Sequence, residues 1–153
     1  MKILMVCLGN ICRSPLAEGI MREKINQHRL PWLVDSAGTG SWHVGNQPDL
    51  RSQAVARQHG LDISRQRARQ FRPADFQDFD LILAMDHSNY QNIQLLAQTP
   101  AQREKVHLIL ELAGASQDDI PDPYWDDNGF EKVYTLLDGA CEKLVACMQV
   151  KTP

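Results

Sequence analysis

The stretch "MVCLGNICRSPLAEGIM", residues 5–21, decides how the chain begins to fold. A run of apolar residues ends at Cys7, passes through a short Gly-Asn turn and leads into a helical pattern. Pro15 suits the first turn of a helix, and Ser14 just before it is predicted to be the N-cap. The stretch therefore predicts a buried strand, a tight loop and a helix in direct succession.

Further apolar runs along the chain resemble strands, and helical patterns alternate with them. This alternation is typical of a doubly wound α/β fold, a three-layer sandwich around a parallel sheet. Such folds bind ligands at the carboxyl ends of their strands, so the loop after the first strand is expected at the mouth of the binding crevice. The predicted strands are Lys2–Val6, Trp32–Ser36, Phe79–Ala84 and Lys105–Leu110.

The composition predicts an ordinary globular protein with one domain over residues 1–153, because 43% of its residues are hydrophobic and 23% are charged. A formal net charge of -3 is unusual for a protein that binds nucleic acid, so we expect no nucleic-acid partner. The basic segment "RQRARQFR", residues 65–72, is interpreted as a solvated surface. No stretch approaches the ~20 apolar residues of a membrane span, and none is expected.

The chain has four cysteines, and its composition is unlike that of small secreted domains. This favours free thiols and a cytoplasmic location. Cys7 and Cys12 have the spacing of half a structural zinc site. The other half is missing, because Cys141 and Cys147 are too far apart and Cys141 lies on the apolar stripe of the last predicted helix. We therefore expect no metal site and no cofactor.

The loop that follows Cys7 has the features of an anion-binding cradle. Gly9 permits a positive φ and Asn10 tolerates one, so successive backbone N–H groups can point inward. The positive end of the following helix points at the same place, and Arg13 can bind two oxygens of a phosphate group. The sequence therefore predicts a binding site for a tetrahedral anion.

Cys7 lies at the base of this cradle. The helix terminus, Arg13 and the Ser14 hydroxyl all favour the thiolate form of its side chain. A thiolate in this position can attack a bound phosphoryl group. The alternative is a buried cysteine that only ends a strand, but this would leave the turn and the arginine without a role. We therefore interpret Cys7 as a nucleophile.

The segment "DIPDPYWDDNGF", residues 119–130, follows the fourth predicted strand and is expected above the same edge of the sheet. Asp122 is held extended by Pro123, and it is a candidate for protonating a leaving oxygen. Tyr124 and Trp125 can form the walls of a cleft for an aromatic ring. The choice of acid stays open from spacing alone, because other carboxylates are near: Asp118, Asp119, Asp126 and Asp127.

Four motifs follow one another along the chain: "VCLGNICRSPLAE" (residues 6–18), "DSAGTGSWHVG" (35–45), "FDLILAMDHSN" (79–89) and "DPYW" (122–125). Together they resemble the low-molecular-weight protein tyrosine phosphatases. The resemblance covers nearly the whole chain and implies a four-stranded parallel sheet. It also implies hydrolysis of phosphotyrosine in proteins, and of small aryl phosphates, through a phosphocysteine intermediate and without a metal.

The resemblance implies a role for individual residues. Cys7 matches the nucleophile, Arg13 the clamp on the transition state, and Asp122 the general acid that later activates water. Asn10 and Ser14 match residues that hold the loop and hydrogen-bond the nucleophile. The residues expected to bind the substrate, including those of the cleft rim and the phosphate loop, are Leu8, Gly9, Asn10, Ile11, Cys12, Ser14, Trp42, Tyr124 and Trp125.

Two other positions bear on the resemblance. Asp86 matches a structural acid near the loop. Family members often have a histidine in "H-x-A-R" that braces the loop asparagine, whereas this chain reads "QRAR" with Gln66 in that place. A Gln side chain can still hydrogen-bond, so catalysis is expected to survive while the rigidity and pH response of the loop are put in doubt.

Two other functions are compatible with parts of the pattern. A thioredoxin-linked arsenate reductase of the same fold needs a pair of resolving cysteines on a mobile segment, but Cys141 and Cys147 both lie on the last predicted helix. A catalytically silent phosphotyrosine-binding module is expected to lack Cys7 or Asp122, and both are present. Phosphatase activity is therefore the favoured function.

Overall fold

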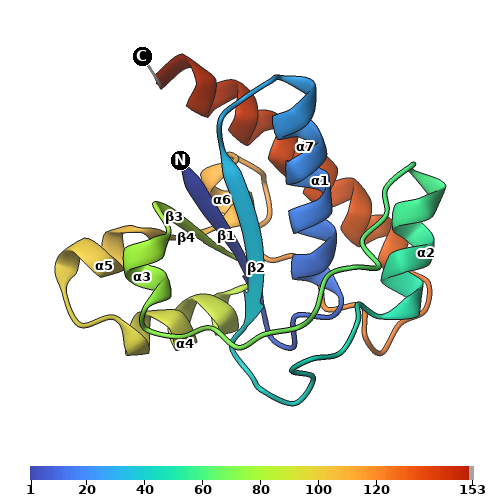
Figure 1. Cartoon of the computed structure of the whole chain (residues 1–153), viewed down its shortest axis with the longest axis horizontal. Helices are drawn as coiled ribbons and strands as arrows, with labels where there is room; N and C mark the ends of the chain where they lie inside the picture. The colour runs from blue at the N-terminus through green and yellow to red at the C-terminus, as the bar shows by residue number, and fades with distance from the viewer. Residues whose placement is uncertain (152–153) are drawn as a thin grey trace.

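The computed structural model describes residues 1–151, whose strands lie in one parallel sheet in the order β2-β1-β3-β4 (Figure 1). The strands are β1 (Lys2–Cys7), β2 (Leu33–Gly38), β3 (Leu81–Ala84) and β4 (Val106–Leu108). The helices are α1 (Arg13–Gln27), α2 (Leu50–Gln58), α3 (Asp75–Asp78), α4 (His87–Leu96), α5 (Pro100–Glu104), α6 (Ile109–Leu112) and α7 (Gly129–Lys151). The predicted α/β fold with a four-stranded parallel sheet is confirmed.

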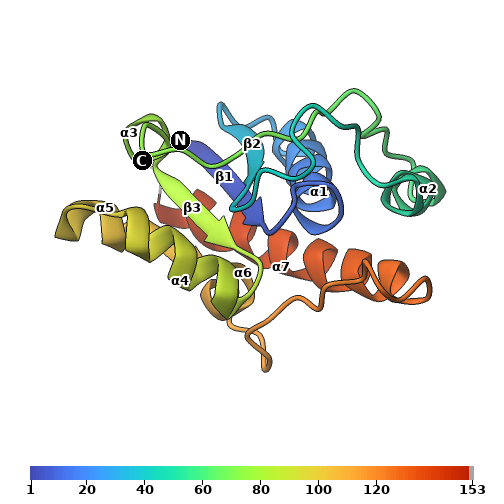
Figure 2. The ribbon, with the colours of Figure 1, turned by 90° about the horizontal axis from the view of Figure 1, so that it is seen from below.

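Strand β1 lies in the middle of the sheet and is covered on both faces. Ile3 and Met5 pack into a core shared with α1 and α7, whereas Leu4 and Val6 pack into a second core shared with α3 and α4. All four side chains are fully buried, which explains the nearly continuous apolar run of the strand. Helices therefore flank the sheet on both sides, as Figures 1 and 2 show, and the three-layer arrangement is confirmed.

The strand boundaries differ from those predicted because pairing with a neighbour limits each strand. β4 has only three residues, since its partner β3 ends at Ala84, opposite Leu108. The predicted continuation to Leu110 was wrong, and the chain turns there into α6. β2 extends to Gly38 rather than Ser36 because its register with β1 continues as far as Cys7.

The helix that follows the phosphate loop starts two residues earlier than predicted, at Arg13 rather than Pro15. Cys12 occupies the N-cap position of α1, and no side chain caps the helix there. The predicted capping role of Ser14 was wrong, because its hydroxyl is engaged with Cys7 and Asn10 instead. Helix α7 begins at Gly129 and buries Cys141 completely on its apolar face. Within residues 1–151 no helix is long and apolar enough to cross a membrane.

Candidate active site

The loop between β1 and α1 is held at the carboxyl end of the sheet by backbone hydrogen bonds to the chain after β2. The N–H of Thr39 donates to the carbonyl of Cys7, and the N–H of Gly40 donates to that of Leu8, each over 2.9 Å. Asn10 adopts a positive φ of 56°, as the sequence allowed, whereas Gly9 does not. Gly9 instead packs closely against His43, since a Cβ there would lie 3.0 Å from the His43 ring.

The loop presents backbone donors that the protein itself does not use. In the described part of the chain, no acceptor is found for the N–H groups of Leu8, Gly9, Ile11 and Cys12. Ile11 and Cys12 are also buried from solvent. Because buried N–H groups without a partner are costly, this arrangement fits an anion whose oxygens accept their hydrogen bonds.

Cys7 is almost fully buried, and its sulfur receives two polar contacts. The N–H of Asn10 donates to Sγ over 3.3 Å, and Oγ of Ser14 lies 3.0 Å from Sγ. The Asn10 amide nitrogen already donates to Oγ of Ser14 over 2.7 Å, so the Ser14 hydroxyl hydrogen is free to point at the sulfur. The Asn10 N–H therefore donates to the Cys7 sulfur and the Ser14 hydroxyl can do the same, an arrangement that suits a negatively charged sulfur.

Asn10 is braced by residues that are distant in the sequence. Its amide nitrogen also donates to Oγ of Ser36 over 3.0 Å, and its Oδ1 accepts from the N–H of Arg69 over 3.0 Å. Ser36 in turn donates to Glu18, whose pKa is raised by burial. Gln66 does not take part, because its amide nitrogen donates to the carbonyl of Pro15. The loop asparagine is thus fixed without the histidine of the family motif.

Arg13 is the first residue of α1, and its guanidinium is buried beside the cradle. Its Nη1 donates to Oδ2 of Asp86 over 2.6 Å and to the carbonyl of Ile120 over 3.0 Å. Burial alone would lower the pKa of Arg13, but Cys7, Asp86 and Asp122 outweigh it and raise the pKa above its usual value. Asp86 also caps α4 through the N–H of Asn89, so it holds Arg13 from a rigid helix end.

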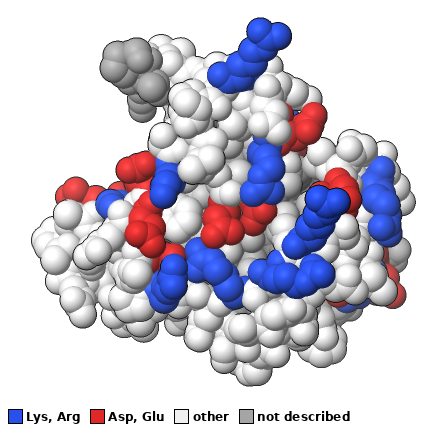
Figure 3. All heavy atoms as spheres, in the orientation of Figure 1, with Lys and Arg blue, Asp and Glu red and all other residues white. Residues whose placement is uncertain are grey.

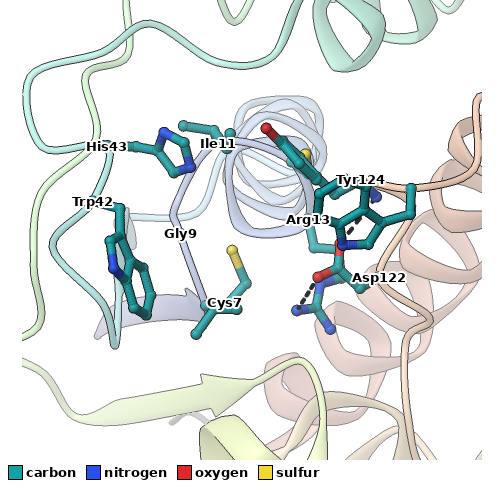
Figure 4. Close-up of a pocket in the computed structure, with 11 residues that line it drawn as sticks. Cys7, Gly9, Ile11, Arg13, Trp42, His43, Asp122 and Tyr124 are labelled. Atoms are coloured by element: carbon teal, nitrogen blue, oxygen red, sulfur yellow. Dashed lines mark hydrogen bonds and ion pairs between the residues drawn. The ribbon is translucent and has the colours of Figure 1, made fainter.

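Asp122 lies beside Arg13 on the same side of the cleft, with 3.7 Å between its Oδ2 and Nη2 of the arginine (Figure 4). Its other oxygen accepts from the N–H of Tyr124, which fixes the carboxyl group and leaves Oδ2 open to the cleft. The neighbouring acids are directed elsewhere: Asp119 contacts His87 and Asp127 contacts Arg51, while Asp126 accepts from the N–H of Asn128. Among the acids left open by the sequence, Asp122 alone lines the cleft with Cys7.

The cleft above Cys7 has a volume of about 340 Å³ and aromatic walls. Figure 4 shows Trp42 and His43 on one side of Cys7, with Tyr124, Arg13 and Asp122 on the other. Trp42 and Trp125 are 72% and 89% exposed, so both indoles stand at the rim. The residues that line the cleft are Cys7, Leu8, Gly9, Ile11, Cys12, Arg13, Trp42, His43, Asp122, Tyr124 and Trp125.

The set of residues that line the cleft differs from the predicted set at three positions. Asn10 and Ser14 do not line the cleft but lie buried beneath it, against Cys7. His43 was not predicted, although it follows Trp42 directly in the sequence. Its ring centroid lies 6.3 Å from that of Tyr124, within the range of a direct aromatic pair, so the two rings approach each other at the cleft.

The other cysteines differ sharply from Cys7 in their surroundings. Burial and the nearby Asp49 raise the pKa of Cys12 far above that of an ordinary thiol. Cys141 is buried in α7 with a pKa raised by burial to about 12, and Cys147 is exposed on the same helix. Neither Cys141 nor Cys147 lines the cleft. Residues 1–151 contain no group of three His, Cys, Asp or Glu side chains placed to hold a metal ion.

Comparisons with known proteins agree on one family. The family model of the low molecular weight phosphotyrosine protein phosphatases matches residues 2–153. A Synechocystis protein named for the low molecular weight protein-tyrosine-phosphatases, slr0328, is 49% identical over 97% of this chain and 96% of its own length. YfkJ of Bacillus subtilis, a low molecular weight protein-tyrosine-phosphatase, is 39% identical over 96% of this chain and 95% of its own.

Solved structures resemble this one over their whole length. The crystal structure of YfkJ has a TM-score of 0.94 at 37% identity and covers 100% of this chain and 97% of its own. A protein tyrosine phosphatase of Entamoeba histolytica, crystallised with Hepes in its active site, has a TM-score of 0.93 at 36% identity. That comparison covers 99% of this chain and 98% of the Entamoeba chain.

Proposed function

The chain belongs to the low molecular weight phosphotyrosine protein phosphatase family, whose members work through a phosphocysteine intermediate, and we propose that Cys7, Arg13 and Asp122 are its catalytic residues. The observation that carries this proposal is the environment of Cys7. Its sulfur receives donors from Asn10 and Ser14 and lies beneath unused backbone N–H groups. The proposed substrate is a phosphotyrosine residue of a protein.

The first step transfers the phosphoryl group to the enzyme. The phosphate oxygens accept hydrogen bonds from the N–H groups of the loop and from Arg13. The arginine neutralises the charge that develops in the transition state. The Cys7 thiolate attacks phosphorus and forms an S–P bond while the P–O bond to the phenol breaks. Oδ2 of Asp122 donates its proton to the departing phenol oxygen, which leaves as tyrosine.

The second step releases inorganic phosphate. The Asp122 carboxylate accepts a proton from a water molecule, whose oxygen attacks phosphorus as the S–P bond breaks. The electron pair of that bond returns to the Cys7 sulfur, where the Ser14 hydroxyl and the Asn10 N–H stabilise the thiolate. Both half-reactions use the same groups, so the enzyme returns to its starting state.

The aromatic walls support an aryl phosphate as the substrate. A phenyl ring bound against the aromatic residues that line the cleft, Trp42, Tyr124 and Trp125, places its phosphate group at the cradle, close to Cys7. The chain's free thiols also support action in a reducing compartment, since an oxidised Cys7 cannot attack phosphorus.

Turnover and trapping test the proposal together. The protein should hydrolyse p-nitrophenyl phosphate and a phosphotyrosine peptide with a metal chelator present, and vanadate should inhibit it. Acid quenching during turnover should trap a phosphate adduct on Cys7, detected by mass spectrometry of its peptide. Cys7→Ser should abolish both turnover and adduct while retaining phosphate binding. An adduct on another residue, or thioredoxin-dependent arsenate reduction without phosphatase activity, would contradict the proposal.

A further inference from the structure

Arginines from the segment between α2 and α3, together with one from α2, form a surface feature that catalysis does not use. Figure 3 shows Lys and Arg side chains in a row across this face of the molecule. We define the basic row as Arg57, Arg65, Arg67 and Arg72, all of which are exposed. Such a row is unexpected in a chain with a formal net charge of -3.

The arginines of the basic row have a carboxylate in their neighbourhood, Asp62, whose pKa is lowered by hydrogen bonds from Ser64 and by the charges of Arg65 and Arg57. Within the described residues, no carboxylate lies within 4.0 Å of the guanidiniums of Arg57, Arg65 or Arg67, and Arg72 reaches Asp75 only at 3.9 Å. Arg67 donates to the backbone carbonyls of Ser64 and Gln66, which fixes its guanidinium without cancelling its charge. By contrast, the neighbouring Arg69 is paired with Asp35 and Asp75 and belongs to the framework.

The basic row is joined to the cleft rim by backbone pairing. The N–H of Gly45 donates to the carbonyl of Ala68, and the N–H of Ala68 donates to the carbonyl of Asn46, each over 2.8 Å. These bonds place Arg67 beside the loop that carries Trp42 and Val44, whose side chains are 72% and 56% exposed. Figure 2 shows the two segments running next to each other. An exposed apolar surface therefore leads from the cleft to the row.

The opposite side of the cleft has the opposite charge. The segment from Asp118 to Glu131 carries several carboxylates, and Asp126 has no cationic partner within the described residues. A polypeptide that crosses the cleft thus meets positive charge on one side and negative charge on the other. Complementary charges of this kind select a partner and its direction rather than adding much affinity.

We propose that the basic row binds acidic residues on one side of the phosphotyrosine in a protein substrate. In this arrangement the phosphotyrosine occupies the cleft, the next side chains cross Trp42 and Val44, and Asp or Glu residues beyond them pair with Arg67 and Arg65. The inference rests on the proposed function, since it assigns the sequence context of the same substrate.

Matched phosphotyrosine peptides test the basic row directly. The first peptide carries Asp and Glu before the phosphotyrosine, and the second carries them after it. The third peptide carries Asn and Gln on both sides. One acidic peptide should exceed the neutral one in kcat/KM by about two- to tenfold at low ionic strength, and the advantage should shrink as salt is added. Arg65→Gln/Arg67→Gln should remove the advantage without changing hydrolysis of p-nitrophenyl phosphate.

The control is Arg103→Gln, because Arg103 is exposed on α5 and has no carboxylate partner within the described residues. It should keep the advantage of the acidic peptide. Equal turnover of all three peptides by the unaltered protein, or an equal loss in Arg103→Gln, would overturn the proposal. Inhibition by short duplex DNA would also overturn it, if Arg65→Gln/Arg67→Gln relieves that inhibition and all three peptides are hydrolysed with the same kcat/KM.

A binding measurement separates this proposal from the proposed function. Fluorescence anisotropy of the labelled peptides on Cys7→Ser protein requires no turnover. A preference for one acidic peptide that disappears with Arg65→Gln/Arg67→Gln supports the basic row even if hydrolysis fails. If the protein hydrolyses p-nitrophenyl phosphate but shows no preference among the peptides, the proposed role of the basic row is wrong, while the phosphatase assignment stands.

Discussion

Nη1 of Arg51 lies 2.5 Å from Oδ1 of Asp127, and this ion pair joins the start of α2 to the loop that precedes α7. The same guanidinium binds Asp49 and lies over the rings of Phe130 and Tyr124, at 4.6 and 5.6 Å from their centroids. Next to it, the N–H of Asp49 donates to the carbonyl of Ile11 in the phosphate loop. The start of α2 therefore connects the two loops that form the cleft.

Arg51→Ala should loosen the wall formed by Tyr124 and raise KM for phosphotyrosine peptides by roughly five- to tenfold, with a smaller change in kcat. Arg51→Lys should recover only part of this loss, because lysine keeps the charge but lacks the planar fork. Asp127→Asn is the control, since it leaves the contacts of Arg51 with Asp49 and the rings in place. Steady-state kinetics on one peptide measure all three variants, and unchanged KM in Arg51→Ala would contradict the prediction.

The stabilisation that Asp49 provides should depend on pH, and Asp49→Asn should remove it. Burial alone would raise the pKa of Asp49, but hydrogen bonds from Arg51 and the N–H of Ser52 outweigh it and lower the pKa. A carboxylate with a lowered pKa stabilises the fold above its unfolded value of ~3.9, and this stabilisation is lost as the pH falls through the folded value. Asn keeps the capping oxygen of α2.

The melting temperature of Asp49→Asn should therefore lie about 1–4 °C below that of the unaltered protein at neutral pH. The difference should shrink as the pH falls below about 4. Differential scanning calorimetry between acidic and neutral pH measures both curves. A constant difference across this range would show that the charge of Asp49 does not contribute.

Asp122→Asn should slow hydrolysis according to the leaving group. A phenol with a pKa of ~10 leaves poorly without a proton, so its phosphate ester should lose about 10²–10⁴ in rate. The hydrolysis rate of nitrophenyl phosphate should fall by a smaller factor, because nitrophenolate can leave without being protonated. Asp126→Asn is the control, since Asp126 does not line the cleft. A uniform loss across a series of aryl phosphates, or an equal effect in Asp126→Asn, would assign the acid to another residue.

Ser14→Ala should slow the release of phosphate from Cys7, because the hydroxyl that stabilises the leaving sulfur is lost. Hydrogen bonds to charged groups are worth ~1.5–3 kcal/mol, which corresponds to a loss of about 10- to 100-fold. Ser36→Ala is the control, since Ser36 binds the Asn10 amide but does not touch the sulfur. Rapid-quench measurements of the phosphoenzyme follow this step. Equal effects of the two variants would attribute the loss to the loop rather than to the sulfur.

Iodoacetate should label Cys7 well before Cys12. The thiolate is the reactive form, and the raised pKa keeps Cys12 protonated through neutral pH. Cys141 should stay unlabelled for the same reason, while the exposed Cys147 provides an internal reference. Peptide mapping by mass spectrometry measures each site, and inorganic phosphate should protect Cys7 but not Cys147. Faster labelling of Cys12 than of Cys7 would contradict this description of the site.

The sequence by itself determined the features that depend on short stretches of chain. The apolar run before Cys7, the Gly-Asn turn and the helix that follows are contiguous, so one motif specifies the strand, the loop, and the places of Cys7 and Arg13 at its two ends. The alternation of strands with helices likewise indicated a parallel sheet and its binding edge. The resemblance to a family then singled out Asp122, which spacing alone had left among several equivalent aspartates.

Only the tertiary structure decided which distant groups meet at the cleft. Asn10 is braced by Ser36 and by the backbone of Arg69, which lie 26 and 59 residues away in the sequence. The partners of Arg13, the direction of Asp122 and the position of His43 depend in the same way on loops from separate strands converging at one edge. The aspartates of residues 118–127 are chemically identical in sequence, and they differ only in what the folded chain places opposite each carboxylate.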